Sequence, residues 1–259
     1  MSLTFPDEPA LVTYFTAGHP SLDGVGDVIV AMDRGGADVI EVGLPFSEPI
    51  AEGPTIQAAI DEALANGMTP DRYFEAVGAT DPDADLAVMT YYNLIFHRGI
   101  ERFVDDCVAA GIDGIIVPDL PVDEADELRE AAHARDVDLV HIVAPTADDD
   151  RVARIVEASS GFVYVQARLG TTGARDDLSA ATFDVLDRLE GHRGDTPIAV
   201  GFGVSSGEHA EAIVEGGADG VVAGSVFVDL LDEIGADGDL APVEELTREL
   251  KQGALRGAE

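Results

Sequence analysis

The chain has 259 residues, 46% of them hydrophobic, and its 51 acidic against 15 basic residues give a formal net charge of −36. This length and apolar content suffice for a globular protein with a sizeable core, and the charge argues against nucleic acid and anionic membranes as partners, because both would repel it. The acidic residues are spread over predicted helices and turns, so we interpret the charge as adaptation to a salty cytoplasm, where the Debye length at molar salt is only ~3 Å.

A single cysteine, Cys107, rules out an internal disulfide, and no CxxC motif or histidine cluster indicates a metal site. The first ten residues, MSLTFPDEPA, have neither the basic nor the apolar region of a signal peptide. No apolar run reaches the ~18 residues expected of a membrane span. We therefore expect a cytoplasmic protein without a metal or a membrane.

Short apolar runs alternate with longer amphipathic stretches along the whole chain. The runs predict eight strands, several of them uninterrupted and β-branched, as expected where helices cover both faces of a parallel sheet: 11–16, 39–43, 86–91, 114–117, 139–143, 162–166, 197–201 and 220–223. Helix-like stretches lie between them, with Asp and Ser near their starts and Gly near their ends: 22–34, 55–65, 100–110, 123–135 and 148–158.

A weak internal repeat favours one architecture. GGADVIEVG at 35–43, AGIDGIIVP at 110–118 and GGADGVVAG at 216–224 share a helix-end glycine, a turn and a strand. Eight βα units in this length fit an α/β fold of the TIM-barrel type, (β/α)8, better than an open doubly wound sheet. We expect a single domain over residues 1–259, with a frayed tail after Leu250.

The second predicted strand carries a carboxylate in its middle, Glu41, and the loop after it holds Glu48 and Glu52 among Gly and Pro. Burying an unpaired carboxylate is costly, so a protein that tolerates one usually pairs it or uses it. Glu41 is therefore a candidate catalytic residue; the alternative is a core glutamate satisfied by a neighbouring donor.

In barrels of this type the active site lies at the carboxyl ends of the strands, and phosphate is often bound after strands seven and eight. GFGVSSGEH at 201–209 and GSVF at 224–227 place Gly and Ser at these two ends, where backbone N–H groups and a helix N-terminus suit an anion. The segment 168–179, RLGTTGARDDLS, is long and rich in Gly and Thr, which suits a mobile lid as well as an ordinary surface loop.

These residues resemble a known family. VIEVGLPFSEPIAEGPTIQ, YYNLIFHRGI, VPDLPVDE, PTADDDR, YVQARLGTTGAR, GFGVSS and AGS occur in the order found in tryptophan synthase alpha chains, over about residues 14–231. The resemblance implies a lyase that cleaves indole-3-glycerol phosphate to indole and glyceraldehyde 3-phosphate in tryptophan biosynthesis. It also implies a beta chain, in an α2β2 tetramer, that carries pyridoxal phosphate and receives the indole, whereas the alpha reaction needs no cofactor.

Carried over by position, Glu41 matches the family's proton-transferring glutamate, and Tyr164 matches a tyrosine beside it. One carboxyl group can protonate the indole C3 and then accept the proton of the glyceryl hydroxyl, if its pKa is tuned toward neutrality. Glu52 stands where the family has a catalytic Asp that accepts the indole N–H, and Glu48 likewise replaces an Asp. Both departures change the reach of the side chain and keep its charge.

The resemblance also predicts the residues that bind the substrate. Thr172 and Gly173 lie in the proposed lid, with Arg168 at its base as an anchor or a surface charge. The expected phosphate site is Gly173, Gly203, Gly224 and Ser225, and the expected apolar slot for the indole ring is Phe15, Ile56, Met89, Ile142 and Phe202. Pro118 stands where the family often has a small residue, which would reshape that slot.

Two other functions compete with this one. The first is another phosphate-binding barrel, such as a sugar-phosphate isomerase or the synthase that makes indole-glycerol phosphate; the latter is expected to use a barrel lysine, and the only lysine is Lys251. The second is a non-catalytic partner that binds ligand and activates a beta chain, which only the departure at Glu52 favours.

Overall fold

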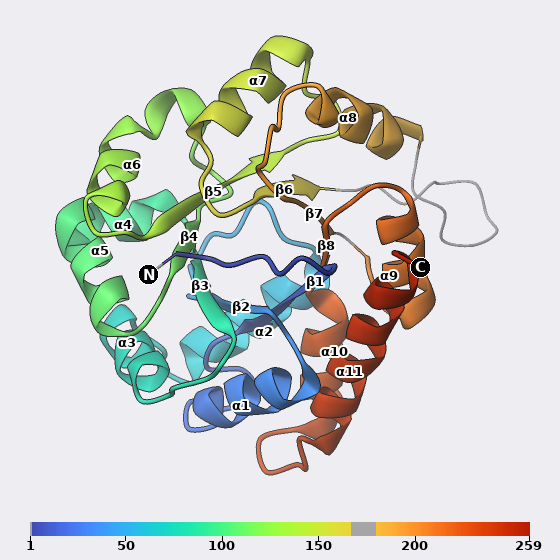
Figure 1. Ribbon diagram of the computed structural model, residues 1–259. Coiled ribbons are helices and arrows are strands. Elements are labelled where there is room, and N and C mark those ends of the chain that lie inside the picture. The colour runs from blue at the N-terminus through green and yellow to red at the C-terminus, as the bar shows by residue number, and fades with distance from the viewer. Residues whose placement is uncertain (1, 167–179, 202) are drawn as a thin grey trace.

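Eight parallel strands close into a barrel in chain order, β1 to β8 (Figure 1). The computed structural model describes residues 2–166, 180–201 and 203–259. The strands are β1 Ala10–Thr16, β2 Val39–Gly43, β3 Asp85–Met89, β4 Gly114–Ile116, β5 Asp138–Val143, β6 Val163–Gln166, β7 Ile198–Gly201 and β8 Gly220–Ala223. All eight strands predicted from the sequence are confirmed, with ends that differ by a few residues.

Helices surround the barrel as an outer layer, and α11 lies along the side formed by α1, α9 and α10 (Figure 1). The helices are α1 Val25–Gly35, α2 Pro54–Ala65, α3 Pro70–Gly78, α4 Tyr92–Arg98, α5 Ile100–Ala109, the 3-10 helix η1 Val122–Glu124, α6 Asp126–His133, α7 Asp149–Ala158, α8 Ala180–Glu190, α9 Gly207–Glu215, α10 Ser225–Ile234 and α11 Ala241–Arg256. None of the helices in the described residues combines the length and the hydropathy needed to cross a membrane.

The three repeats form the joints between a helix and the next strand. In each, one glycine adopts a positive φ, +94° at Gly36, +72° at Gly111 and +98° at Gly217, which a residue with a Cβ rarely adopts. The aspartate two residues later bonds the neighbouring strand: Asp38 Oδ2 accepts from Leu11 N at 2.7 Å, for example. The repeat thus turns the chain and sets the register of adjacent strands at the same time.

A cluster of apolar side chains fills the barrel interior toward the amino ends of the strands. Val12, Val39, Ile116, Val140 and Phe162 point inward, together with small residues. The N-terminal segment closes the amino end of the barrel, because Leu3 and Phe5 pack into this cluster. A Cβ at Gly114 would lie 2.5 Å from Leu3 Cδ1, and one at Gly220 would lie 2.8 Å from Phe5 Cε1. Glycine at these two positions therefore leaves room for the side chains of Leu3 and Phe5, which close the amino end of the barrel.

Two expectations about the helices are wrong. The predicted helix 123–135 is split at Ala125, whose N–H bonds Val122 O, an i to i−3 bond, so that η1 ends there and α6 begins at the next residue. The tail after Leu250 is not frayed, because α11 runs to Arg256 and packs on α9. A Cβ at Gly253 would lie 2.1 Å from Gly207 O, and Ala254 is fully buried, so the two helices touch backbone to backbone.

Candidate active site

Glu41 lies inside the barrel, in the middle of β2. Its ladder partners are Tyr14 of β1 and Ala87 of β3. The residue is 1% exposed, and its Oε1 atom has no hydrogen-bond partner among the residues that the structure describes. The alternative, a structural glutamate whose oxygens accept hydrogen bonds from neighbouring donors, therefore does not describe Oε1.

Burial, and to a smaller extent the negative charge of Glu52, raises the pKa of Glu41 to about 8. At neutral pH such a carboxyl group holds its proton and can donate it. Once it has donated, the resulting carboxylate is a base strong enough to take a proton back near the same pH. A single side chain here can therefore act first as an acid and then as a base.

Two buried tyrosines interact electrostatically with Glu41. Tyr164, on β6, has its pKa raised by burial and then by the charge of Glu41. Its hydroxyl lies near Gly201, where an added Cβ would come within 3.1 Å of it. Tyr14 contacts Thr16 through the two hydroxyl groups at 3.0 Å, and burial raises its pKa. Both phenols are therefore neutral at physiological pH and can only share or orient protons around the carboxyl group.

Glu52 lies in the loop between β2 and α2 and is half-buried. The hydroxyl of Tyr91 donates to Glu52 Oε2 in a short hydrogen bond. The backbone oxygen of Glu52 accepts from Gln57 Nε2 at 2.8 Å. Glu48, four residues earlier, is exposed. The charge of Glu52 raises the pKa of Glu41, so the two predicted catalytic acids interact electrostatically.

The apolar residues predicted for the ring slot do not all face the barrel. Met89, Ile142 and Tyr164 pack against the apolar cluster inside the barrel. Ile56 packs with Met89 and Tyr14. Phe15 is fully buried on the other side of β1, in the core between the strands and the helices, so its assignment to the slot is wrong. Successive residues of a strand point to opposite faces, and the inward position belongs to Tyr14.

The turns after β7 and β8 carry the Gly and Ser residues of the phosphate prediction. Gly203 adopts φ +80°, and Ser206 caps α9 by accepting from His209 N. Gly224 precedes Ser225, the first residue of the ten-residue helix α10. Neither 201–209 nor 224–228 contains Lys or Arg, so an anion would be bound by amides, hydroxyls and the helix dipole. Arg168, Thr172, Gly173 and Phe202 lie outside the described residues.

Tyr14 lies between the turn after β8 and the end of β2. A Cβ at Gly224 would lie 3.3 Å from Tyr14 Cδ1, and one at Gly43 would lie 2.6 Å from the Tyr14 hydroxyl. The ring therefore fills the space between the ends of β8 and β2. Sequence reasoning missed Tyr14 and Tyr91 as site residues. Tyr14 lies beside Glu41 on the adjacent strand, and Tyr91 lies two residues after the end of β3; these positions were the signals that could have identified them.

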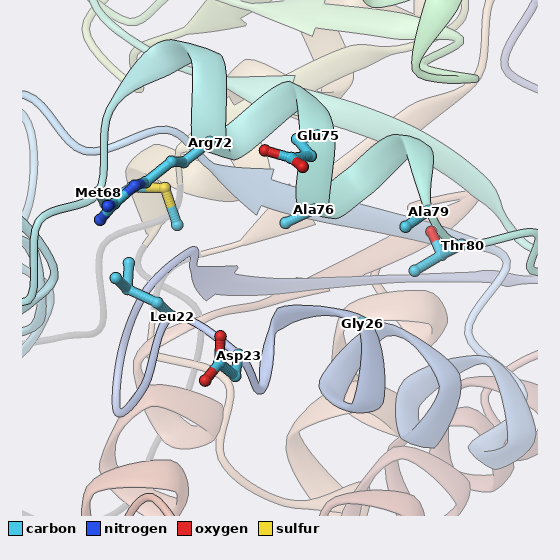
Figure 2. A pocket seen from close by; sticks show the side chains of 9 residues that line it. All are labelled: Leu22, Asp23, Gly26, Met68, Arg72, Glu75, Ala76, Ala79 and Thr80. Carbon is cyan, nitrogen blue, oxygen red and sulfur yellow. The ribbon is translucent and has the colours of Figure 1, made fainter.

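A cavity of about 540 Å³ opens elsewhere, between the start of α1 and helix α3 (Figure 2). Asp23 and Leu22 face Arg72 and Glu75 across it. None of its lining residues is a predicted site residue. A second group outside the predicted site, His19, Glu62 and Asp232, has ligand atoms within 4.8 Å of one another, and in it His19 Nδ1 lies 2.8 Å from Glu62 Oε2.

Comparisons with known proteins agree on one family. The family model described as "Tryptophan synthase alpha chain" matches residues 2–255. Tryptophan synthase alpha chains of Natronomonas pharaonis and Haloferax volcanii are 53% and 52% identical to this chain, over 97% and 98% of it and 94% of each relative. The structure of Mycobacterium tuberculosis tryptophan synthase superposes with a TM-score of 0.86 at 36% identity, covering 96% of this chain and 93% of that one. A chain of the α2β2 complex of Pyrococcus furiosus gives 0.83 at 37% identity, over 95% and 96%.

Proposed function

Because the chain belongs to the tryptophan synthase alpha chain family, we propose that Glu41, Glu52 and Tyr164 perform the reaction of that family in it. The reaction is the cleavage of indole-3-glycerol phosphate to indole and glyceraldehyde 3-phosphate. The proposal treats residues 1–259 as one barrel domain with a single site at the carboxyl end of the strands.

The substrate spans the barrel mouth in this proposal. Its indole ring enters the slot lined by Ile56, Met89 and Ile142, with Tyr14 in the place first given to Phe15. Its phosphate meets the turns that carry Gly203, Gly224 and Ser225, where amides and a helix N-terminus offer donors without a cationic side chain. Thr172, Gly173 and Phe202 complete this binding site by family resemblance.

Glu41 transfers two protons in turn. Its carboxyl group donates a proton to C3 of the indole ring, which places a positive charge on the ring. The carboxylate then takes the proton of the hydroxyl on the carbon attached to C3. As the O–H electrons form the aldehyde, the C3–carbon bond breaks and its electrons return to the ring, releasing indole. A carboxyl group with a pKa of about 8 is suited to both steps.

Glu52 and Tyr164 support the ring while it is charged. The carboxylate of Glu52 accepts the ring N–H, and its negative charge opposes the positive charge that develops there. Tyr164, whose pKa is raised by burial and then by the charge of Glu41, orients the proton of that carboxyl group in this proposal. All these steps use side chains alone, so we propose that the alpha reaction proceeds without a cofactor.

The beta chain is the partner of this chain. Similar solved structures include the tryptophan synthase complex of Pyrococcus furiosus, an α2β2 assembly. Pyridoxal phosphate belongs to the beta chain of such a complex. The indole released by the alpha chain is the substrate for that second site.

The burial of Glu41 without a partner for Oε1 is the observation that carries the proposal. Its test is indole release by the purified chain in molar KCl, with and without a beta chain. Glu41→Gln should lower kcat by about 100-fold or more, the range for removal of a general acid–base, while Glu124→Gln at an exposed position should leave it unchanged. Wild-type rates for Glu41→Gln would remove the proton shuttle, whereas no indole release by the wild-type chain would favour the non-catalytic partner.

A further inference from the structure

The hydroxyl group of Tyr91 is the centre of a hydrogen-bond cluster in the loop after β2. It accepts from the backbone N–H groups of Ile50 at 2.7 Å and Ala51 at 2.8 Å, and it donates to Glu52 Oε2. A phenol has one donor and two acceptor lone pairs, so every hydrogen-bonding capacity of this group is used. Three consecutive residues of the loop are thereby tied to one atom.

Tyr91 stands on a rigid base. It directly follows Thr90, whose N–H donates to Ile116 O at 3.1 Å and whose hydroxyl donates to Leu44 O at 3.2 Å. The end of β3 is thus joined to β4 on one side and to the end of β2 on the other. Tyr91 itself is only 3% exposed, and its ring stacks on Phe46 with centroids 5.1 Å apart.

The loop, by contrast, has little packing of its own. Ile50 is 79% exposed, and Glu48 and Ala51 are also exposed. An exposed loop orders a side chain poorly unless something buried restrains it. Among the described residues, Glu52 bonds through its side chain to Tyr91 and through its backbone oxygen to Gln57.

From these contacts we infer that Tyr91 is a positioning residue, which sets the carboxylate of Glu52 for the indole N–H by fixing both the loop backbone and the carboxylate itself. This inference rests on the proposed function of Glu52. The glutamate side chain is one methylene longer than the aspartate of the family and has one more rotatable bond. A fixed donor at its end removes that extra freedom, so Tyr91 gives the longer acid a defined position.

The kinetic test compares two buried tyrosines. Tyr91→Phe removes the hydroxyl and keeps the ring; the control, Tyr73→Phe, removes a fully buried hydroxyl that donates to Val42 O at 2.8 Å and not to the loop that carries Glu52. We expect Tyr91→Phe to lower kcat for indole release about 10- to 100-fold with KM changed by less than about threefold, because misplacing a catalytic group costs mainly kcat. Tyr73→Phe should lower the urea midpoint and leave kcat unchanged.

Glu52→Ala separates this inference from the proposed function. Loss of activity in Glu52→Ala with a wild-type kcat in Tyr91→Phe would overturn the positioning role alone. Wild-type activity in Glu52→Ala would overturn the role of Glu52 and the inference with it. Equal losses of kcat in Tyr91→Phe and Tyr73→Phe would also refute the inference, since they would indicate a general effect on folding.

Hydrogen exchange provides a readout that does not depend on activity. In the wild-type chain the amides of Ile50 and Ala51 should exchange more slowly than those of Glu48 and Glu52, which have no acceptor among the described residues. Tyr91→Phe should remove this protection. Equal exchange rates for the four amides in the wild-type chain would show that the cluster does not restrain the loop and would overturn the inference.

Discussion

As the pH rises, Glu41 should lower the stability of the fold, because it keeps its proton in the folded state while it ionises readily in the unfolded state. Replacing Glu41 should remove this loss of stability. Its pKa rises from 4.5 in an exposed chain to about 8 in the fold, chiefly through burial. The folded state therefore binds the proton more tightly than the unfolded state. Stability from this group is complete below about pH 4.5 and declines as the pH rises toward about 8.

The magnitude follows from linkage. At pH 7 the folded group still holds its proton, whereas the unfolded group has been ionised over about 2.5 pH units, and each unit is worth about 1.4 kcal/mol. Glu41→Gln is isosteric and neutral, so it should raise the free energy of unfolding by roughly 3 kcal/mol at that pH. For a chain of this size that gain corresponds to about 6–12 °C in Tm.

The assay is urea unfolding in molar KCl at about pH 5, 7 and 8.5, followed by circular dichroism. The difference between Glu41→Gln and the wild type should be small at the lowest pH and grow at each step. The exposed control, Glu124→Gln, should show no such growth. A difference that stays constant across the three pH values would refute the reasoning, because it would mean that burial does not hold the proton on Glu41.

Three further predictions address the second acid, the buried histidine and the net charge. Glu52→Asp should retain activity and Glu52→Ala should lose it, as measured by indole release; equal rates would remove the ring-nitrogen role. His141 is 5% exposed, and burial, then the charge of Arg129, lowers its pKa from 6.5 to about 4. His141 therefore lowers the stability of the fold as the pH falls below about 6.5. The free energy of unfolding of His141→Met, measured in urea, should rise relative to that of the wild type by roughly 2 kcal/mol when the pH is lowered from about 7.5 to 5. An equal difference at both pH values would contradict this. The net charge of −36 predicts a lower Tm in dilute buffer than in molar KCl, and identical melts would show that self-repulsion is not limiting.

Much of the chemistry could be predicted from the chain alone because it depends on local pattern. Glu41 interrupts an apolar run that can only be a buried strand, so its burial followed from its neighbours. The repeats around Gly36, Gly111 and Gly217 predicted the turns between a helix and the next strand, because a tight turn after a helix often requires a residue with a positive φ. The Gly and Ser after the last two strands led to the proposed anion site, because glycine lets backbone amides approach a ligand closely.

The sequence determined which strands form, in which order, and that a carboxyl group lies among them. The tertiary structure decided which face each strand side chain occupies: every residue of β1 is buried, so alternation of polar and apolar residues could not separate Tyr14 from Phe15. It also decided that the hydroxyl of Tyr91 reaches Glu52, a contact 39 residues apart in the chain, and that residues after Leu250 pack on α9. Such contacts depend on distances between elements, and a pattern along one chain contains no such distances.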